Sequence, residues 1–124
     1  MNKYYVKCDY LLRKVTMVAL VKKHIAFLML ILTTERKQAL VLLNTITLQQ
    51  AKLIYEVFHN IMSNSLHLET RTIGLLRRYK STIKYLSGRA SVKNKQRYIK
   101  SHKKQVFTIL RLVNKKLLPY IDTL

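Results

Sequence analysis

Only two glycines and one proline interrupt the 124 residues of this chain, and this scarcity narrows its possible folds more than any other feature. Glycine and proline supply most of the backbone geometries of tight turns, so the chain offers few positions at which strands can reverse. Alternating polar and apolar residues, which strands produce, are also missing. The apolar residues instead recur at intervals of three and four, the repeat of a helix with one buried side. We therefore expect an all-α protein.

Capping residues mark where several of the helices should begin. Thr34 and Ser91 are each placed to cap a short helix, and Thr47 with Gln50 forms a capping-box pattern. Gly88 is expected to adopt the left-handed conformation that closes the last turn of the preceding helix. We expect a compact bundle of five or six short helices in a single domain, 1–124, with helices over 15–32, 36–43, 48–62, 69–86, 92–101 and 103–118.

The stretch 15–32 is the most apolar part of the chain. Its uninterrupted apolar run, 25–32, is much shorter than the roughly 20 residues that a bilayer requires. Its flanking charges also lie in the wrong places for a signal peptide. We therefore expect a core helix buried on most sides, with a membrane-inserting element as the alternative, in an intracellular protein without signal peptide or transmembrane span.

Three of the later helices carry one apolar stripe each, which predicts their inner faces. The predicted inward residues are Leu48, Ala51, Ile54, Tyr55, Phe58, Ile61 and Met62 in 48–62, Ile73, Leu76, Tyr79, Ile83 and Leu86 in 69–86, and Val106, Ile109, Leu110, Val113 and Leu117 in 103–118.

Positive charge is abundant and unevenly distributed. The chain has 24 Lys and Arg against 5 Asp and Glu, a formal net charge of +19. Residues 1–65 form a more apolar, core-forming half, whereas 66–124 form a strongly basic half with no acidic residue between Arg71 and Lys116. Because like charges repel one another in a compact state, such a chain calls for a partner of opposite sign. Phosphate backbones are the first candidate, and anionic membranes are the second.

Residue patterns for catalysis or metal binding are not found. The sequence has no HExxH, CxxC, GxSxG or glycine-rich phosphate-loop motif. The histidines and the few carboxylates lack the spacings that would bring them together, and the single cysteine, Cys8, excludes an internal disulfide. We expect a protein that is not an enzyme and that uses no cofactor and no metal.

The basic half mixes its cations with aromatic residues. Lysine and arginine on helix faces can follow a phosphate backbone, and exposed aromatic rings can stack on bases. Tyr79 is expected in the core because of its helical spacing, whereas Tyr98 is equally compatible with core and surface. The predicted nucleic-acid-binding residues are Arg77, Arg78, Lys80, Lys84, Arg89, Lys93, Asn94, Lys95, Arg97, Lys100, Lys103 and Lys104.

Two alternatives to simple backbone binding remain open. Helices 69–86 and 92–101 have the lengths of a helix-turn-helix, and the second opens with Asn94, Gln96 and Arg97, side-chain types that read base edges in the major groove. The last helix carries Lys103, Arg111 and further cations beside its apolar residues, as membrane-surface helices do. Sequence-independent binding is the favoured interpretation, with DNA preferred to RNA and a membrane third.

Short motifs in 38–120 are shared with a known group of proteins. They are Asn60-Ile61, Leu76-Arg77-Arg78-Tyr79-Lys80, Ile83-Lys84-Tyr85-Leu86 and Ser91-Val92-Lys93-Asn94-Lys95-Gln96-Arg97-Tyr98-Ile99. In these motifs the chain resembles a short basic protein of Polinton/Maverick-type elements and adintovirus-like DNA viruses. Family members continue into Gly-Gly and an apolar tail, whereas 101–106 here read Ser-His-Lys-Lys-Gln-Val. The resemblance implies a basic virion core protein that binds packaged DNA, in the nucleus or the virion, with other element-encoded proteins as further partners.

Overall fold

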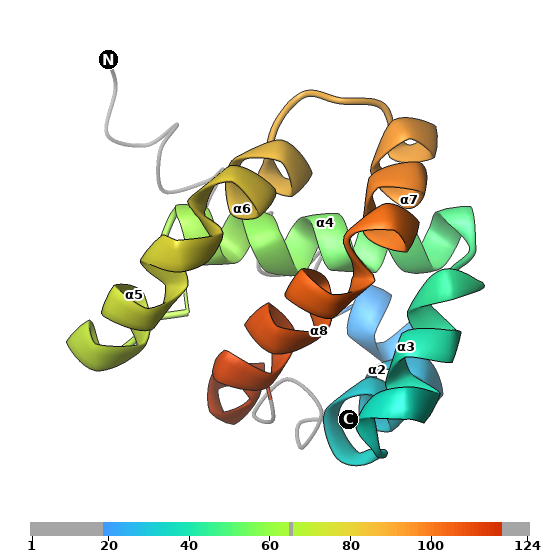
Figure 1. Ribbon diagram of the computed structural model, residues 1–124, viewed down its shortest axis with the longest axis horizontal. Helices are drawn as coiled ribbons and strands as arrows, with labels where there is room; N and C mark the ends of the chain where they lie inside the picture. Colours follow the sequence, from blue (N-terminus) through green and yellow to red (C-terminus); the bar gives the residue numbers. More distant parts are fainter. Residues whose placement is uncertain (1–18, 65, 118–124) are drawn as a thin grey trace.

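The computed structural model describes residues 19–64 and 66–117, and every regular element in these ranges is helical, which confirms the all-α prediction. Residues 19–23 and 114–117 are also helical. Cys8, Pro119 and the outer ends of the first and last predicted helices lie outside the described residues. The elements are α2 (Ile25–Thr33), α3 (Arg36–Asn44), α4 (Leu48–Met62), α5 (Thr70–Leu76), the 3-10 helix η1 (Arg77–Tyr79), α6 (Lys80–Ser87), α7 (Val92–Ser101) and α8 (Lys103–Leu112), as Figure 1 shows.

Helix α4 is the element against which two helices of the basic half, α6 and α7, pack. It contacts both α6 and α7, and in Figure 1 it crosses the molecule behind α8. The predicted capping box at its start is present: the Gln50 backbone N–H donates to Thr47 Oγ1 at 3.1 Å, and the Thr47 backbone N–H donates to Gln50 Oε1 at 3.0 Å. Two otherwise unsatisfied backbone donors are thereby paired, which stabilises the first turn.

The buried side of α4 is wider than the predicted stripe. Leu53 and Val57 are fully buried as well as the predicted Ala51, Ile54 and Phe58. The prediction was wrong for the two ends of the stripe, because Leu48 is 47% exposed and Met62 is 49% exposed. Both α6 and α7 pack against α4, so its buried side is wider than a single stripe.

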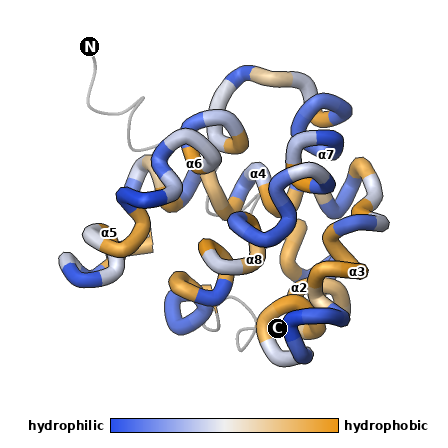
Figure 2. The backbone as a smooth tube through the Cα atoms, in the orientation of Figure 1, coloured by the Kyte–Doolittle hydropathy of each residue, from blue (hydrophilic) through white to orange (hydrophobic). Residues whose placement is uncertain are grey.

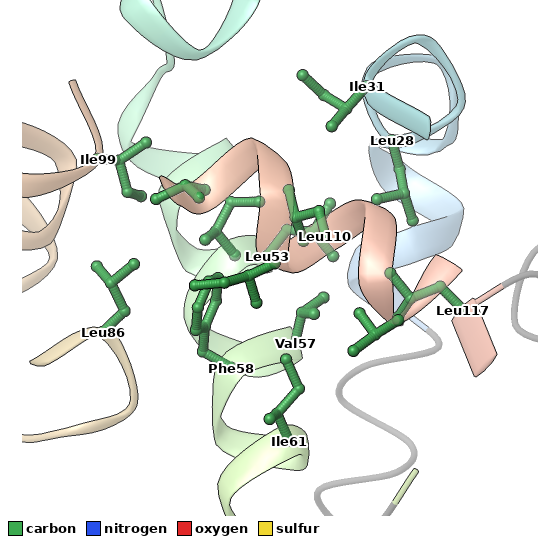
Figure 3. Close-up of a cluster of buried hydrophobic side chains, with 14 of the residues drawn as sticks. Leu28, Ile31, Leu53, Val57, Phe58, Ile61, Leu86, Ile99, Leu110 and Leu117 are labelled. Carbon is green, nitrogen blue, oxygen red and sulfur yellow. The ribbon is translucent and has the colours of Figure 1, made fainter. Parts of the chain in front are cut away.

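The hydrophobic core draws on both halves of the chain. In Figure 3 the side chains of Leu53, Val57 and Phe58 lie at its centre, on α4. Around them lie Leu86 of α6, Ile99 of α7, Leu110 of α8, Leu117, and Leu28 and Ile31 of α2. The two halves distinguished by charge therefore share one core.

The first predicted helix is interrupted and only partly buried. A turn at His24 separates residues 19–23 from α2. Helix α2 buries Leu28 and Ile31, but Leu30 is 48% exposed, so burial on most sides was wrong. Thr34 does not cap α3: Glu35 holds the N-cap position, and Thr34 Oγ1 donates to Gln38 Oε1 at 2.7 Å. No helix of the described residues combines the length and the apolar character needed to cross a bilayer.

The predicted helix over 69–86 is divided into α5, η1 and α6. Tyr79 leaves helical geometry, with φ −111° and ψ 23°, and its ring is partly buried against the core, as expected. Helix α5 packs against α8, whereas α6 packs against α4 and α7. One straight helix cannot serve both sets of partners, so the tighter turn of η1 redirects the chain between them. Ile73, predicted to face inward from α5, is exposed as a result.

The connection from α6 to α7 differs from the prediction at Gly88. Its φ of −90° and ψ of −158° are extended, so the left-handed prediction was wrong. Glycine is required there by close approach, because a Cβ atom would lie 2.9 Å from the Lys84 carbonyl oxygen. The left-handed conformation occurs instead at Asn64, after α4, where φ is 57°. Ser91 caps α7 as predicted, since its Oγ accepts from the Asn94 backbone N–H at 3.1 Å.

The predicted inner face of the last helix is confirmed. Val106, Ile109, Leu110, Val113 and Leu117 are all buried, although a turn at Val113 ends α8 earlier than expected. The apolar side of α8 is thus covered by the core, which favours a packed helix over a membrane-surface helix.

Candidate nucleic-acid interface

The predicted cations belong mainly to η1, α6, the 88–91 connection and α7. Helix α6 buries Thr82, Ile83 and Leu86 against the core, and α7 buries Ile99. With 3.6 residues per turn, most of the remaining residues of α6 and α7 point away from the core. Figure 2 shows the result along α7, where the tube is mostly hydrophilic.

Most of the predicted site residues are exposed. We call the exposed cations among them the basic surface. No Asp or Glu occurs between Glu69 and Asp122 to offset the positive charge of this surface. Asn94, the one predicted uncharged site residue, is exposed too. The basic surface consists of Arg77, Arg78, Lys80, Lys84, Arg89, Lys93, Arg97, Lys100 and Lys104.

Lys95 was wrongly predicted to face a phosphate backbone. Its side chain is only 3% exposed. The Nζ atom donates to the Gly88 carbonyl oxygen at 2.6 Å and lies 3.6 Å from the centroid of the Tyr55 ring. A buried ammonium needs such acceptors because leaving water is costly for a charge. The charge of Lys95 therefore holds the 88–91 connection and α7 against α4.

Lys103 and Gln96 are also engaged inside the fold. Lys103 is half-buried, and its Nζ donates to Asn44 Oδ1 at 3.2 Å, which ties α8 to α3. Gln96 Nε2 donates to the Ile46 carbonyl oxygen at 2.8 Å. Of the three α7 residues proposed to read base edges, only Asn94 and Arg97 are exposed.

Three cations of the basic surface border an apolar cavity. Arg77, Lys80 and Lys84 line a hollow of about 370 Å³ between α4, α5 and α6. Its floor and walls are mainly aliphatic and include the exposed Met62 and Ile73. Positive charge and uncovered apolar surface thus lie side by side here.

A second cluster of cations was missed by the sequence reasoning. Arg71 at the start of α5 lines a cavity of about 310 Å³ together with Arg111, Lys115 and Lys116 from the end of the chain. Arg111 also donates from Nη2 to the Thr34 carbonyl oxygen and lies over the Phe107 ring, 4.9 Å from its centroid. The cluster joins residues far apart in sequence, so no local pattern reveals it. The only signal was the absence of acidic residues from Arg71 to Lys116.

Three aromatic rings form a continuous stack beside the basic surface. Tyr85 of α6 and Tyr98 of α7 have ring centroids 4.1 Å apart and an interplanar angle of 17°. Tyr98 and His102 follow at 3.9 Å and 11°. Tyr98 is partly buried and packs against the core, whereas Tyr85 is 36% exposed. Tyr98 is therefore partly in the core and partly at the surface, the two locations that the sequence left open.

Within residues 19–64 and 66–117, no three His, Cys, Asp or Glu side chains come together as a metal site. The basic surface and the ring stack beside it provide positive charge, hydrogen-bond donors and one exposed aromatic ring. Comparison with known proteins adds nothing to this, since no protein-family model, no curated protein and no solved structure matches the chain.

Proposed function

We propose that this protein is a non-enzymatic nucleic-acid-binding protein that holds the phosphate backbone without reading sequence. The observation that supports this most directly is the basic surface itself: cations on α6 and α7 are exposed on helices whose other sides are buried, and the exposed Arg77 and Arg78 of η1 precede them. Phosphate contacts of this kind give affinity that is independent of sequence. Asn94 and Arg97 are positioned to add base contacts, which would be a refinement of the same function.

The proposed biological setting follows from the resemblance to proteins of Polinton/Maverick-type elements. A small protein with a net charge of +19 can neutralise many phosphates per molecule, which suits DNA packaging in a virion core. We propose duplex DNA ahead of structured RNA as the principal partner, in the nucleus or the virion.

A salt titration of binding to duplex DNA, structured RNA and anionic vesicles tests the proposal. Neutralising about six phosphates gives a slope of log K against log salt of about −5, because each contact contributes about −0.9 on duplex DNA. Replacing Arg77, Arg78, Arg97 and Lys100 by Gln removes four charges from the basic surface. This variant should bind duplex DNA more weakly, and its slope should be shallower by about 3.6 if each of the four side chains contacts one phosphate.

The matched control removes four exposed charges from the other half. Lys22, Lys23, Arg36 and Lys37 replaced by Gln lower the net charge equally but lie on 19–23 and α3. The slope of log K against log salt for this control should be close to that of the original protein. Equal losses in the two variants would show that net charge alone attracts DNA, and an unchanged slope in the first variant would refute the assigned surface.

Binding to anionic membranes is the second candidate function. It is favoured by the cavity in which Arg77, Lys80 and Lys84 border exposed apolar side chains. Peripheral membrane binding combines attraction to anionic lipid with burial of apolar surface. Leakage of anionic vesicles at low salt, with weak and shallow binding to both nucleic acids, would establish this candidate and exclude the first.

A further inference from the structure

We propose that the stack of Tyr85, Tyr98 and His102 is a platform on which an unpaired base of a single strand stacks, against the outer face of Tyr85. This inference rests on the proposed nucleic-acid function and narrows its substrate. It predicts that the protein distinguishes a strand with free bases from one without them, which backbone contacts alone do not do.

The order of the rings follows from their geometry. Tyr85 and His102 each lie nearly parallel to Tyr98, with centroids 4.1 Å and 3.9 Å away. Two rings placed side by side on one face of Tyr98 would have to be further from its centroid than these distances allow. They therefore cover its opposite faces, and Tyr98 is the middle ring. Tyr85 and His102 are the two ends of the stack.

Tyr85 is the end that is open to a ligand. It is 36% exposed, whereas His102, the other end, is more buried. The neighbouring ring restricts the side-chain rotamers of Tyr85, so little conformational entropy remains to be lost when a base binds. An aromatic ring presented in this way accepts any base, because every base has a π face.

The rest of the stack is anchored by polar contacts. The Tyr98 hydroxyl lies 3.4 Å from Thr82 Oγ1, and Thr82 in turn hydrogen-bonds to Gln105. His102 Nδ1 lies 3.1 Å from the Tyr98 carbonyl oxygen. These contacts link α6, α7 and α8, so the ring of Tyr98, on which Tyr85 packs, is held in place by the fold.

Cations are placed to hold the strand's phosphates beside the platform. Lys80, Lys84 and Tyr85 are all exposed on α6. The two lysines are four residues apart and share one side of the helix, and Tyr85 follows Lys84 about 100° further around it. A single strand that crosses this exposed part of α6 can place phosphates near the two lysines and a base on the ring. The interior bases of a duplex are stacked on both faces and cannot do this.

The test compares three probes with the full chain at one salt concentration: a single-stranded oligothymidine, an abasic strand of equal length, and a duplex. We expect the oligothymidine to bind about tenfold more tightly than the abasic strand. Tyr85→Leu should abolish that preference and leave duplex binding unchanged, while Tyr85→Phe should retain it. Because the protein has no tryptophan, its eight tyrosines give its fluorescence, and the part of the quenching by oligothymidine that is lost in Tyr85→Leu reports the stacking.

The outcomes separate this inference from the proposed function. Equal affinity for the oligothymidine and the abasic strand, or a Tyr85→Leu variant that keeps the preference, would overturn the platform. Salt-dependent duplex binding would then still support the proposed function. Failure to bind any of the three probes would refute both. Retained duplex binding by Tyr85→Leu also shows that this variant is folded.

Discussion

The two halves of the chain contribute to the same core but differ in what they expose. Both halves leave aliphatic side chains uncovered, such as Leu30 and Val41 in the first and Leu75 in the second, but the first half has fewer cations around them. The second half exposes the basic surface, on helices whose inner sides pack against α4. The cations that repel one another thus lie on the outward faces of helices. The hydrophobic core, to which the less charged half contributes, stabilises the fold against this repulsion.

Helix α7 shows the same division within a few residues. Lys93 is exposed, whereas Lys95 is buried beside Gly88 and Tyr55. The two residues are both lysines of α7 and differ in the side of the helix on which they lie. A lysine in this protein is therefore a surface ligand or a structural group according to its helical position, and each prediction below tests that separation between core and surface.

The largest effect is expected from the residue that joins the halves. Phe58 of α4 is fully buried at the centre of the core, so Phe58→Ala leaves a cavity and should lower the free energy of unfolding by about 3–5 kcal/mol. Urea denaturation followed by circular dichroism should show one transition at a lower midpoint, because both halves lose the same packing partner.

Val41→Ala is the control, since Val41 is exposed on α3 and its truncation should change stability by less than about 0.5 kcal/mol. Two separate transitions in Phe58→Ala, one near the original midpoint, would show that the halves are independent units. The conclusion that the two halves share one core and differ only in their surfaces would then be wrong.

The next largest effect distinguishes the two lysines of α7. Lys95→Met removes the donor to the Gly88 carbonyl oxygen, and we expect a loss of about 1–3 kcal/mol in the free energy of unfolding. Lys93→Met should change stability by less than about 0.5 kcal/mol but should weaken duplex binding and reduce the salt slope by about 1. A Lys95→Met protein that is fully stable yet binds DNA more weakly would reverse the two assignments.

Local sequence signals predicted much of the local structure, although Thr34 does not cap α3 and Gly88 is extended. The capping residues Thr47 and Ser91 act as expected because a cap depends only on a few neighbouring residues. The apolar stripe of the last helix was also correct, since all five of its residues are buried. Exposed cations were mostly right for the same reason: they occupy the helix positions that the stripe leaves.

Features that depend on tertiary partners could not be predicted. The division of 69–86 at η1 arises because α5 and α6 pack against different helices. The burial of Lys95 depends on Tyr55, which is 40 residues earlier in the chain. The grouping of Arg71 with Lys115 and Lys116 requires the end of the chain to return to α5. A reading of one helix at a time contains none of these contacts.

A smaller effect compares one cap from each half. Thr47→Ala and Ser91→Ala each remove an acceptor for a backbone N–H, and each should cost about 1 kcal/mol. The two losses should be similar, because Thr47→Ala leaves the second bond of the capping box, from the backbone N–H of residue 47 to Gln50 Oε1, in place. Thermal or urea denaturation measures both. Thr47→Ser keeps the hydroxyl and should be close to the original protein; a loss as large as that of Thr47→Ala would mean that the methyl group, and not the cap, stabilises α4.

The smallest effect concerns the less charged half and is a dependence of stability on pH. Burial, with a further contribution from the charge of Lys23, holds the pKa of His24 below its usual value of 6.5. The unfolded chain therefore takes up a proton near pH 6.5 while the folded protein does not, so the unfolded state is favoured as the pH falls. The stability that depends on neutral His24 is complete above pH 6.5 and is lost as the pH decreases toward the lowered pKa.

Denaturation midpoints at pH 7.5 and 5.5 measure this loss, and two variants identify its source. His24→Gln cannot take up the proton and should reduce the difference between the two pH values. Lys23→Gln removes the neighbouring charge but not the burial, so it should reduce the difference less, since burial is the larger cause. If Lys23→Gln had the greater effect, repulsion between cations and not exclusion of water would govern this position, and charge would then limit stability in the less charged half as well as in the basic one.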